Sequence, residues 1–257
     1  SIADPLAFPA DTTMYYVSGT DANGCSNIDS VEIIINPLPT TTATAAADEI
    51  CIGDSTQLTA SGGINYVWIP GDSLTDDSIS NPIAFPTDTT NYVVKVTDGN
   101  GCSNKDSVEI IVNPLPTVTA TADDDEICSG DSSQLSATGP VLSVFSWLPT
   151  DSISDPNISN PIVFPSDTTT YVVTVVDSNS CVNKDSVTIT VNPLPVVSAT
   201  ATALAICIFD TTQLDATGGI SYIWTPSDSL SDDSIANPLA FPADTTMYYV
   251  SGTDTNG

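Results

Sequence analysis

Residues 170–176 read TYVVTVV, and residues 187–191 read VTITV. In both segments an apolar side chain occupies every second position, which is the period of a β-strand with one buried face. The residues between them, Asp177–Lys184, are mostly polar and suit a turn. We therefore predict that the two segments form a β-hairpin.

Shorter strands are predicted in the rest of residues 117–192. The opening segment Thr117–Ala122 (TVTATA) alternates, and Asp123–Asp125 breaks it. Further segments of strand composition are Ser133–Ala137 (SQLSA), Val144–Leu148 (VFSWL) and Ile162–Phe164. Prolines bound the last of these, so we expect it at a sheet edge. No stretch has an apolar period of 3.6 residues. Six or seven short strands predict an all-β domain, a small β-sandwich.

The same pattern recurs along the chain. Residues 1–24 return at 234–257 with changes only at Asp4 and Ala22. The motif Asn-Pro-Leu-Pro recurs at almost equal spacing, at Asn36–Pro39, Asn113–Pro116 and Asn192–Pro195. Such a period is typical of tandem domains. The predicted domains are a C-terminal half repeat (1–37), two complete repeats (38–114 and 115–193) and a repeat that lacks its final strand (194–257), so we expect the chain to be part of a longer protein.

The charge of the chain is strongly one-sided. There are 32 acidic residues against three lysines, with no arginine and no histidine, and the net charge is −29. This excludes the basic surface that nucleic acid requires, and it opposes docking on anionic lipid. It suits solubility in high salt, binding of divalent cations, or both. Without histidine or arginine a nucleophile lacks its commonest base, so we predict no catalytic residue and no enzyme.

Two cysteines occupy fixed places in each repeat. One precedes the Gln-Leu strand and the other follows the Asn-Gly turn. Pairing within repeats would join Cys51 to Cys102 and Cys128 to Cys181, leaving the partners of Cys25 and Cys207 outside the sequence. Because the two loops that carry these cysteines lie at opposite ends of a simple sandwich, pairing between adjacent domains or between chains stays open. Periodic cysteines in a chain without histidine indicate disulfides, and hence a location outside the cytoplasm.

Recurring aromatic residues are the predicted core. One tryptophan per repeat falls where a sandwich places its central aromatic side chain, and one tyrosine follows Asp-Thr-Thr at the start of the penultimate strand. This tyrosine is expected to form a tyrosine corner, in which the hydroxyl ties the strand to the preceding loop. The alternative is a set of exposed platforms that stack on sugars. The residues are Trp68, Trp147, Trp224, Tyr92, Tyr171 and Tyr248.

Several motifs together resemble one family of repeats. They are Ile-Cys-x-Gly-Asp-Ser-x-Gln-Leu, Tyr-x-Trp, Asn-Pro-x-Ala-Phe-Pro, Asp-Thr-Thr-x-Tyr-x-Val, Asp-x-Asn-Gly-Cys and Val-x-Ile-x-Val-Asn-Pro-Leu-Pro. The pattern resembles the immunoglobulin-like or PKD-like repeats of giant surface proteins from Bacteroidota, which include gliding adhesins and filament-forming proteins. The resemblance implies tandem immunoglobulin-like sandwiches and an extracellular stalk, adhesin or fibre. Ser180 replaces the usual turn glycine, and Phe209 stands where other repeats have Gly53 and Gly130, so the turn at Phe209 is expected to differ.

Two groups of acidic residues are candidates for weak calcium sites. Asp-x-Asn-Gly is a fragment of the oxygen-rich loops that bind this ion, although it is also a standard hairpin turn. In the long loop after each tryptophan, crowded carboxylates repel one another, which a divalent ion would relieve. The alternative there is a solvated acidic surface. The candidate ligands are Asp21, Asn23, Asp98, Asn100, Asp72, Asp76, Asp77, Asp228, Asp232 and Asp233.

Asp followed by Ser or Thr recurs in every repeat. The pattern resembles the acceptor motif of the general O-glycosylation system of Bacteroidota, although Asp-Ser and Asp-Thr also open turns. The candidate acceptors are Ser30, Ser55, Ser73, Ser78, Thr89, Ser107, Ser152, Thr168, Ser186, Thr211, Ser229, Ser234 and Thr245.

The linker and the repetition together predict that the protein functions through its length. Two prolines in Asn-Pro-Leu-Pro fix φ and favour an extended path, so we expect a semi-rigid rod. The leading hypothesis is a structural segment of a very long extracellular surface or filament protein, which projects from the cell or assembles into a fibre with copies of itself. The alternatives are an adhesin whose repeats bind glycans or cell surfaces, and a passive spacer of a secreted hydrolase. Calcium is the one cofactor considered, and no membrane insertion is expected.

Overall fold

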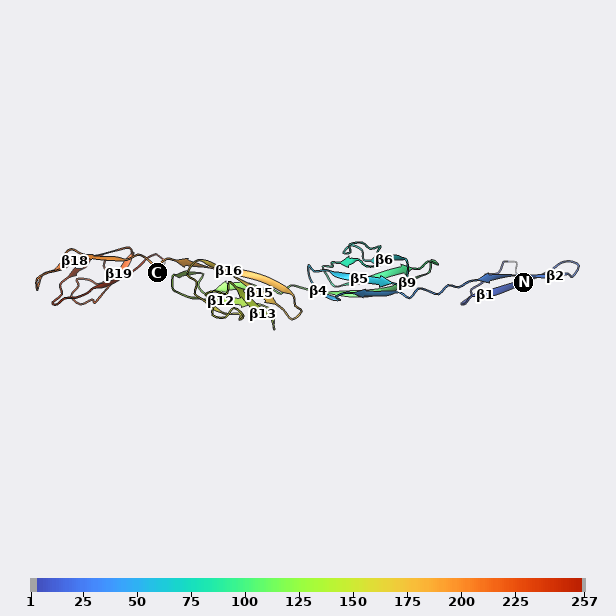
Figure 1. The fold of residues 1–257 in the computed structure, drawn as a ribbon, viewed down its shortest axis with the longest axis horizontal. Coiled ribbons are helices and arrows are strands. Elements are labelled where there is room, and N and C mark those ends of the chain that lie inside the picture. Colours follow the sequence, from blue (N-terminus) through green and yellow to red (C-terminus); the bar gives the residue numbers. More distant parts are fainter. Residues whose placement is uncertain (1–3, 256–257) are drawn as a thin grey trace. The chain divides into compact units, whose positions relative to one another are not determined.

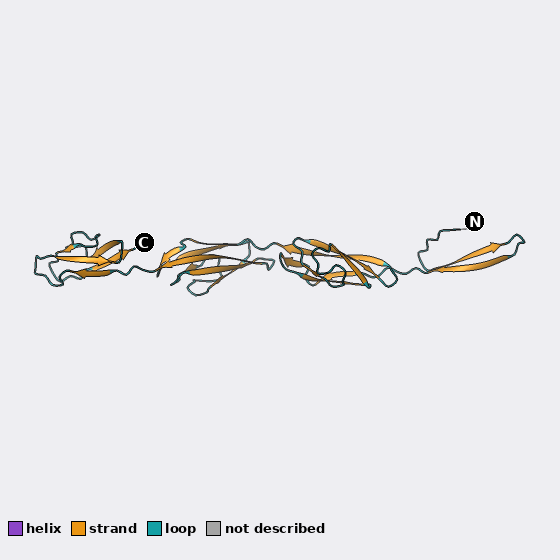
Figure 2. Ribbon diagram, turned by 90° about the horizontal axis from the view of Figure 1, so that it is seen from above, coloured by secondary structure: helices purple, strands orange, loops and turns teal. Residues whose placement is uncertain are grey.

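The computed structural model describes residues 4–255 and contains strands, turns and loops, with no helix among these residues. Figure 2 shows the strands in orange. The chain divides into two compact units, Ser1–Leu115 and Pro116–Gly257, and the division falls inside the linker Asn113–Pro116. The prediction of an all-β fold is confirmed.

The repeat at residues 38–114 is a sandwich of two sheets (Figure 1). One sheet has the order β3-β5-β7, and the other has the order β4-β9-β8-β6. The strands are β3 (Thr42–Ala45), β4 (Glu49–Cys51), β5 (Thr56–Ser61), β6 (Asn65–Ile69), β7 (Ile83–Ala84), β8 (Thr90–Thr97) and β9 (Ser103–Asn113).

The repeat at residues 115–193 has the same two sheets, β10-β12-β14 and β11-β16-β15-β13. The strands are β10 (Thr119–Ala122), β11 (Glu126–Cys128), β12 (Ser133–Thr138), β13 (Val144–Leu148), β14 (Ile162–Val163), β15 (Thr169–Val176) and β16 (Val182–Asn192). The predicted hairpin is β15–β16, although β16 begins five residues earlier than the alternation indicates. Its polar first half pairs fully with β15, because ladder hydrogen bonds do not depend on apolar side chains.

The opening strand of each complete repeat is divided between the two sheets. β10 pairs antiparallel with β12, and after the break at Asp123–Asp125 the chain forms β11, which runs parallel to β16. This parallel strand is not predicted from the sequence, because it is three residues long with one apolar side chain, Ile127. Two facing sheets with this strand order define the fold. Each complete repeat is an immunoglobulin-like sandwich.

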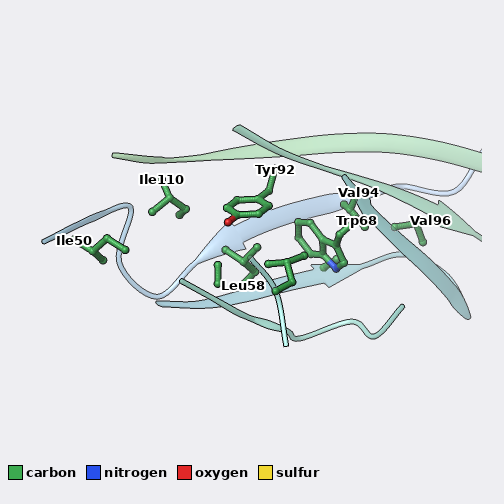
Figure 3. Packing of buried hydrophobic residues seen from close by; sticks show 10 residues of the cluster. Ile50, Leu58, Trp68, Tyr92, Val94, Val96 and Ile110 are labelled. Carbon is green, nitrogen blue, oxygen red and sulfur yellow. The ribbon is translucent and has the colours of Figure 1, made fainter. Parts of the chain in front are cut away.

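The core of each sandwich lies between its sheets. In residues 38–114, Leu58, Trp68 and Tyr92 are buried with Val94 and Ile110 (Figure 3). These side chains come from alternate positions of β5, β8 and their neighbours, as the period of two requires. A separate cluster around Trp147 fills residues 115–193, and a third around Trp224 fills residues 194–257.

The outer repeats have fewer strands. In residues 1–37, β1 (Thr13–Thr20) pairs with β2 (Ser26–Ile33). Residues 194–257 form the sheets β17-β18-β20 and β19-β21. These strands are β17 (Ser198–Ala201), β18 (Thr212–Thr217), β19 (Ser221–Thr225), β20 (Leu239–Ala240) and β21 (Tyr249–Thr253).

The turn at Phe209 keeps the shape it has in the other repeats, contrary to expectation. The amide of Asp210 donates to the carbonyl of Cys207 at 3.0 Å, as Asp54 does to Cys51 at 3.0 Å. Phe209 therefore adopts φ +71°, a left-handed conformation in which Gly53 has +93°. A bulky residue is strained in that region, and the Phe209 side chain is 92% exposed.

Replacing Phe209 by glycine is therefore expected to stabilise this repeat by about 1 kcal/mol, because glycine removes the strain without losing a core contact. Urea unfolding followed by Trp224 fluorescence measures the change. The reverse substitution at the matched position, Gly53→Phe, should destabilise by a similar amount. A Phe209→Gly variant that unfolds at lower urea than the parent would contradict this account.

Candidate functional sites

In the repeat at residues 38–114, the second cysteine lies beside the linker that precedes the repeat. Cys102 follows the turn between β8 and β9, and its Sγ donates to the carbonyl oxygen of Asn36 at 3.9 Å. Two residues later, Asn104 Nδ2 donates to the carbonyl oxygen of Pro39 at 3.1 Å. The turn therefore holds both ends of the linker Asn36–Pro39.

The first cysteine lies at the other end of the sandwich. Cys51 ends β4 and is the register partner of Asn113, the last residue of β9. Cys102 directly precedes this eleven-residue strand. At about 3.3 Å per residue, the two ends of β9 are roughly 33 Å apart. The Cα atoms of a disulfide lie within about 7 Å, so Cys51 and Cys102 of one repeat cannot be joined.

The state of the cysteines agrees with these positions. Cys51 and Cys181 are disulfide-bonded, whereas Cys25, Cys102 and Cys207 carry free thiols. The predicted pair Cys51–Cys102 is therefore wrong. The predicted pair Cys128–Cys181 is wrong for the same geometric reason, because Cys128 is in register with Asn192 at the far end of β16.

The Asp-x-Asn-Gly motif forms a closed turn. Asp98 Oδ1 accepts the amides of Asn100 and Cys102, both at 2.9 Å, and Asp21 makes the same two bonds to Asn23 and Cys25. Backbone donation from Cys25, and then from Asn23, lowers the pKa of Asp21. These carboxylates stabilise a hairpin turn, which is the alternative to a calcium loop.

The acidic residues of the long loop are also engaged locally. Asp76 Oδ1 accepts from the Ser78 hydroxyl at 2.6 Å and from the Ser78 amide at 2.8 Å. These bonds lower the pKa of Asp76, the hydroxyl more than the amide. Asp232 and Ser234 repeat the arrangement, while Asp72, Asp77 and Asp228 are exposed and Asp233 is half-buried. Within residues 4–255, no three His, Cys, Asp or Glu side chains are grouped to hold a metal ion. Calcium binding stays a prediction, which melting curves in chelator and in millimolar calcium would check.

The candidate glycosylation acceptors fall into two classes. Ser73, Ser152 and Ser229 are half-buried, and the other ten are exposed. Thr89 and Thr168 also accept a backbone hydrogen bond, from Val112 at 3.1 Å and from Val191 at 3.0 Å. Modification itself stays a prediction, and the exposed serines that make no such bond are the better acceptors.

The aromatic series is buried rather than displayed. Trp68 Nε1 donates to the carbonyl of Ile79 at 3.0 Å, and Trp147 and Trp224 make the equivalent bond. The Tyr92 hydroxyl bonds with the Ser73 hydroxyl at 2.6 Å. Tyr171 donates to the carbonyl of Ser152 at 3.4 Å, and burial raises its pKa. Tyr248 is half-buried and donates to Ser229 at 3.5 Å. These positions leave no sugar-stacking platform among the six residues.

A tie between the two sheets is not predicted from the sequence. Asp106 Oδ2 accepts the amide of Ala43 at 2.8 Å, and Asp185 Oδ2 accepts the amide of Ala120 at 2.8 Å. The strongest cause of the lowered pKa of Asp185 is this bond, followed by the Ser186 amide. The signal lies in the recurring motif Cys-x-Asn-Lys-Asp-Ser at Cys102–Ser107 and Cys181–Ser186, which contains both this aspartate and the asparagine that binds the linker.

Asp185→Asn is expected to lower the melting temperature at pH 7. Because the folded pKa lies below the unfolded value of about 3.9, the carboxylate contributes fully above that value and loses its contribution as the pH falls through the folded pKa. The gap between the parent and the variant should therefore narrow from pH 7 to pH 3. Asp151→Asn, an equal change of charge at an exposed position of the same repeat, is the control. A gap that widens toward pH 3 would contradict the assignment.

An apolar edge recurs on the short strands β7, β14 and β20. The phenylalanine that follows each strand is about half exposed: Phe85 45%, Phe164 51% and Phe241 48%. The outward-facing residues Ile83, Ile162 and Leu239 are exposed to a similar degree. Prolines flank each segment, as expected for an edge strand protected against pairing.

A cavity of about 740 Å³ lies within residues 199–248. Its walls include Leu214, Trp224 and Tyr248, which belong to the core of this repeat. Its titratable wall residues are Cys207, Asp244 and Tyr248. No helix long and apolar enough to cross a membrane occurs in residues 4–255.

Comparisons with known proteins find similarity at the level of structure. No family model matches the chain, and no curated protein matches it. A titin fragment, I67–I69, is 10% identical over 86% of this chain and 95% of the fragment, with a TM-score of 0.39. A Ca2+-stabilized adhesin of an ice-binding Antarctic bacterium is 14% identical over 90% of this chain and 74% of that chain, with a TM-score of 0.37. Murine CEACAM1b is 14% identical over 59% of this chain and its own full length, with a TM-score of 0.30. Because these identities and TM-scores are low, the fold is assigned from the strand order described above.

Proposed function

We propose that this chain is a structural segment of a long extracellular surface or filament protein, without enzymatic activity. It acts by length and stiffness: successive sandwiches are joined by short linkers that are held at both ends. The observation that carries the proposal is the set of side-chain hydrogen bonds to those linkers. The disulfide-bonded cysteines support the extracellular location, since disulfides persist in oxidising compartments.

In the linkers Asn113–Pro116 and Asn192–Pro195, the first residue is tied to the repeat before it. Asn113 Nδ2 donates to Glu49 Oε1 at 2.8 Å, and Asn192 Nδ2 donates to Glu126 Oε1 at 2.7 Å. Asn113 and Asn192 also end the longest strands of their repeats, β9 and β16. The linker therefore leaves each sandwich from a strand end that is already fixed.

In the linkers Asn36–Pro39 and Asn113–Pro116, the last residue is tied to the repeat after it. Asn183 Nδ2 donates to the carbonyl of Pro116 at 2.9 Å, as Asn104 does to Pro39 at 3.1 Å. Pro39 and Pro116 are buried. Only Pro114 and Leu115 remain between the two tied ends of the linker Asn113–Pro116. A proline there restricts φ, so the free segment has few conformations left.

Asn183→Ala is expected to loosen the linker Asn113–Pro116, because it removes a hydrogen bond worth about 1 kcal/mol. The heteronuclear NOE of the Leu115 amide should fall toward values typical of flexible loops. Asn104→Ala is the matched control: it should lower the NOE of Leu38 and leave that of Leu115 unchanged. An equally low NOE at Leu115 in the parent chain would contradict a stiff linker and with it the proposed function.

An adhesin is the second candidate, and the apolar edge of β7, β14 and β20 favours it. An edge repeated in three copies offers several weak contacts along one chain, either to a cell surface or to other copies in a fibre. A glycan array probed with the chain separates the cases, because a structural segment should bind no glycan. Sedimentation at high salt, where the charge of −29 is screened, would detect association between copies.

A further inference from the structure

The two cysteines of a repeat are placed at two different linkers. In residues 38–114, Cys102 Sγ contacts the carbonyl of Asn36 in the preceding linker at 3.9 Å. Cys51 is the register partner of Asn113 in the following linker. Adjacent strands lie about 4.8 Å apart, so each cysteine is close to the asparagine that begins one linker.

Comparison of equivalent positions in successive repeats predicts that the two kinds of cysteine lie at the same linker. Asn36 and Asn113 are the same position of Asn-Pro-Leu-Pro, and Cys181 is the residue of the next repeat that corresponds to Cys102. The side chain of Asn183, two residues after Cys181, already holds Pro116 of the linker Asn113–Pro116. Cys181 is therefore expected at Asn113, where Cys51 already lies.

We propose that Cys51 and Cys181 form a disulfide that bridges the linker Asn113–Pro116 and joins two successive repeats. Both residues are disulfide-bonded, and Cys181 is fully buried. The rule also accounts for the free thiols. Of the three linkers, only Asn113–Pro116 has both of its cysteines within the 257 residues, and Cys102, beside the linker Asn36–Pro39, is a thiol.

The bond forms by thiol–disulfide exchange. One cysteine thiolate attacks a small-molecule disulfide or the disulfide of an oxidoreductase, which forms a mixed disulfide and releases one thiolate of the oxidant. The second cysteine thiolate then attacks the protein sulfur of this mixed disulfide and releases the other thiolate of the oxidant. The two cysteine thiols lose two protons and two electrons, and the oxidant is reduced to two thiols. Only the source of this oxidant depends on the extracellular location proposed above, and refolding with oxidised glutathione makes the test independent of that location.

Lysine-specific digestion of the whole chain tests the bridge. The three lysines, Lys95, Lys105 and Lys184, divide the sequence into fragments 1–95, 96–105, 106–184 and 185–257. The monomer, refolded with oxidised and reduced glutathione, is alkylated and digested without reduction. We expect fragment 1–95 to be joined to fragment 106–184, and fragments 96–105 and 185–257 to carry alkylated cysteine. Reduction should release the joined pair.

Two variants identify the sulfur atoms. Cys25→Ser/Cys128→Ser removes the other cysteine of each joined fragment and should keep the link, whereas Cys51→Ser should abolish it. A bond from 1–95 to 96–105, a bond inside 106–184, or alkylation of both Cys51 and Cys181 would overturn the proposal. So would a covalent dimer in place of a bridged monomer, because the bond would then join separate chains.

Discussion

Trp147→Ala is expected to destabilise the repeat at residues 115–193 by about 3–5 kcal/mol, the usual cost of removing a fully buried tryptophan. The side chain is 0% exposed, and its Nε1 donates to the carbonyl of Ile158 at 3.0 Å. For a domain of this size the loss corresponds to a fall of roughly 15–30 °C in melting temperature. The truncation also leaves that carbonyl without its donor.

The effect should be confined to one repeat, because the three core clusters are separate. Trp68 and Trp224 then report the other two repeats by fluorescence, and hydrogen exchange at Val173 reports the mutated one. Val144→Ala is the control, since Val144 is on the same strand but 64% exposed. If all three repeats lose stability together in the Trp147→Ala variant, the repeats are not independent sandwiches.

Gly62→Ala is expected to cost about 2–4 kcal/mol, the sum of backbone strain and a steric clash. Gly62 has φ +110°, and a Cβ there would lie 2.2 Å from the carbonyl oxygen of Thr40, just after the linker. The Thr40 oxygen is a backbone atom and not the end of a flexible side chain, so the backbone itself must move to admit the Cβ. The melting temperature of residues 38–114 should fall by roughly 10–25 °C.

Two glycines provide controls for this substitution. A Cβ on Gly99 meets nothing within 4 Å, and Gly99 has no left-handed φ, so Gly99→Ala should be nearly neutral. Gly218 repeats the strained position, with φ +95° and Val196 oxygen at 1.9 Å, so Gly218→Ala should destabilise residues 194–257 instead. A neutral Gly62→Ala, measured by calorimetry, would show that this backbone approach is not as close as described.

Much of the fold could be predicted from local pattern. The alternation in Thr170–Val176 shows which side chains of that strand are buried, so the hairpin could be predicted from periodicity. The burial of Trp147 could be predicted in the same way, from the alternation in Val144–Leu148. The prolines around Ile162 likewise identify the edge strand. These features depend on residues close in sequence, because alternation and flanking prolines act within one strand and its ends.

The pairing of cysteines could not be predicted in this way. It depends on which end of the sandwich each cysteine occupies, and that end is set by the short parallel strand Glu49–Cys51, whose one apolar residue gives no periodic signal. The hydrogen bonds of Asn104 and Asn183 to the linkers are hidden for a related reason. They join residues more than sixty positions apart, although their repeated spacing after each cysteine is visible in the sequence.

Small-angle X-ray scattering of the whole chain, at a salt concentration that screens its charge, tests the central claim most directly. Sandwiches of about 40 Å each, held end to end by stiff linkers, predict a radius of gyration of about 40 Å. A single merged globule of this length would give about 18 Å. A value near 40 Å with a rod-like profile is the result we predict, and a value near 18 Å would contradict it.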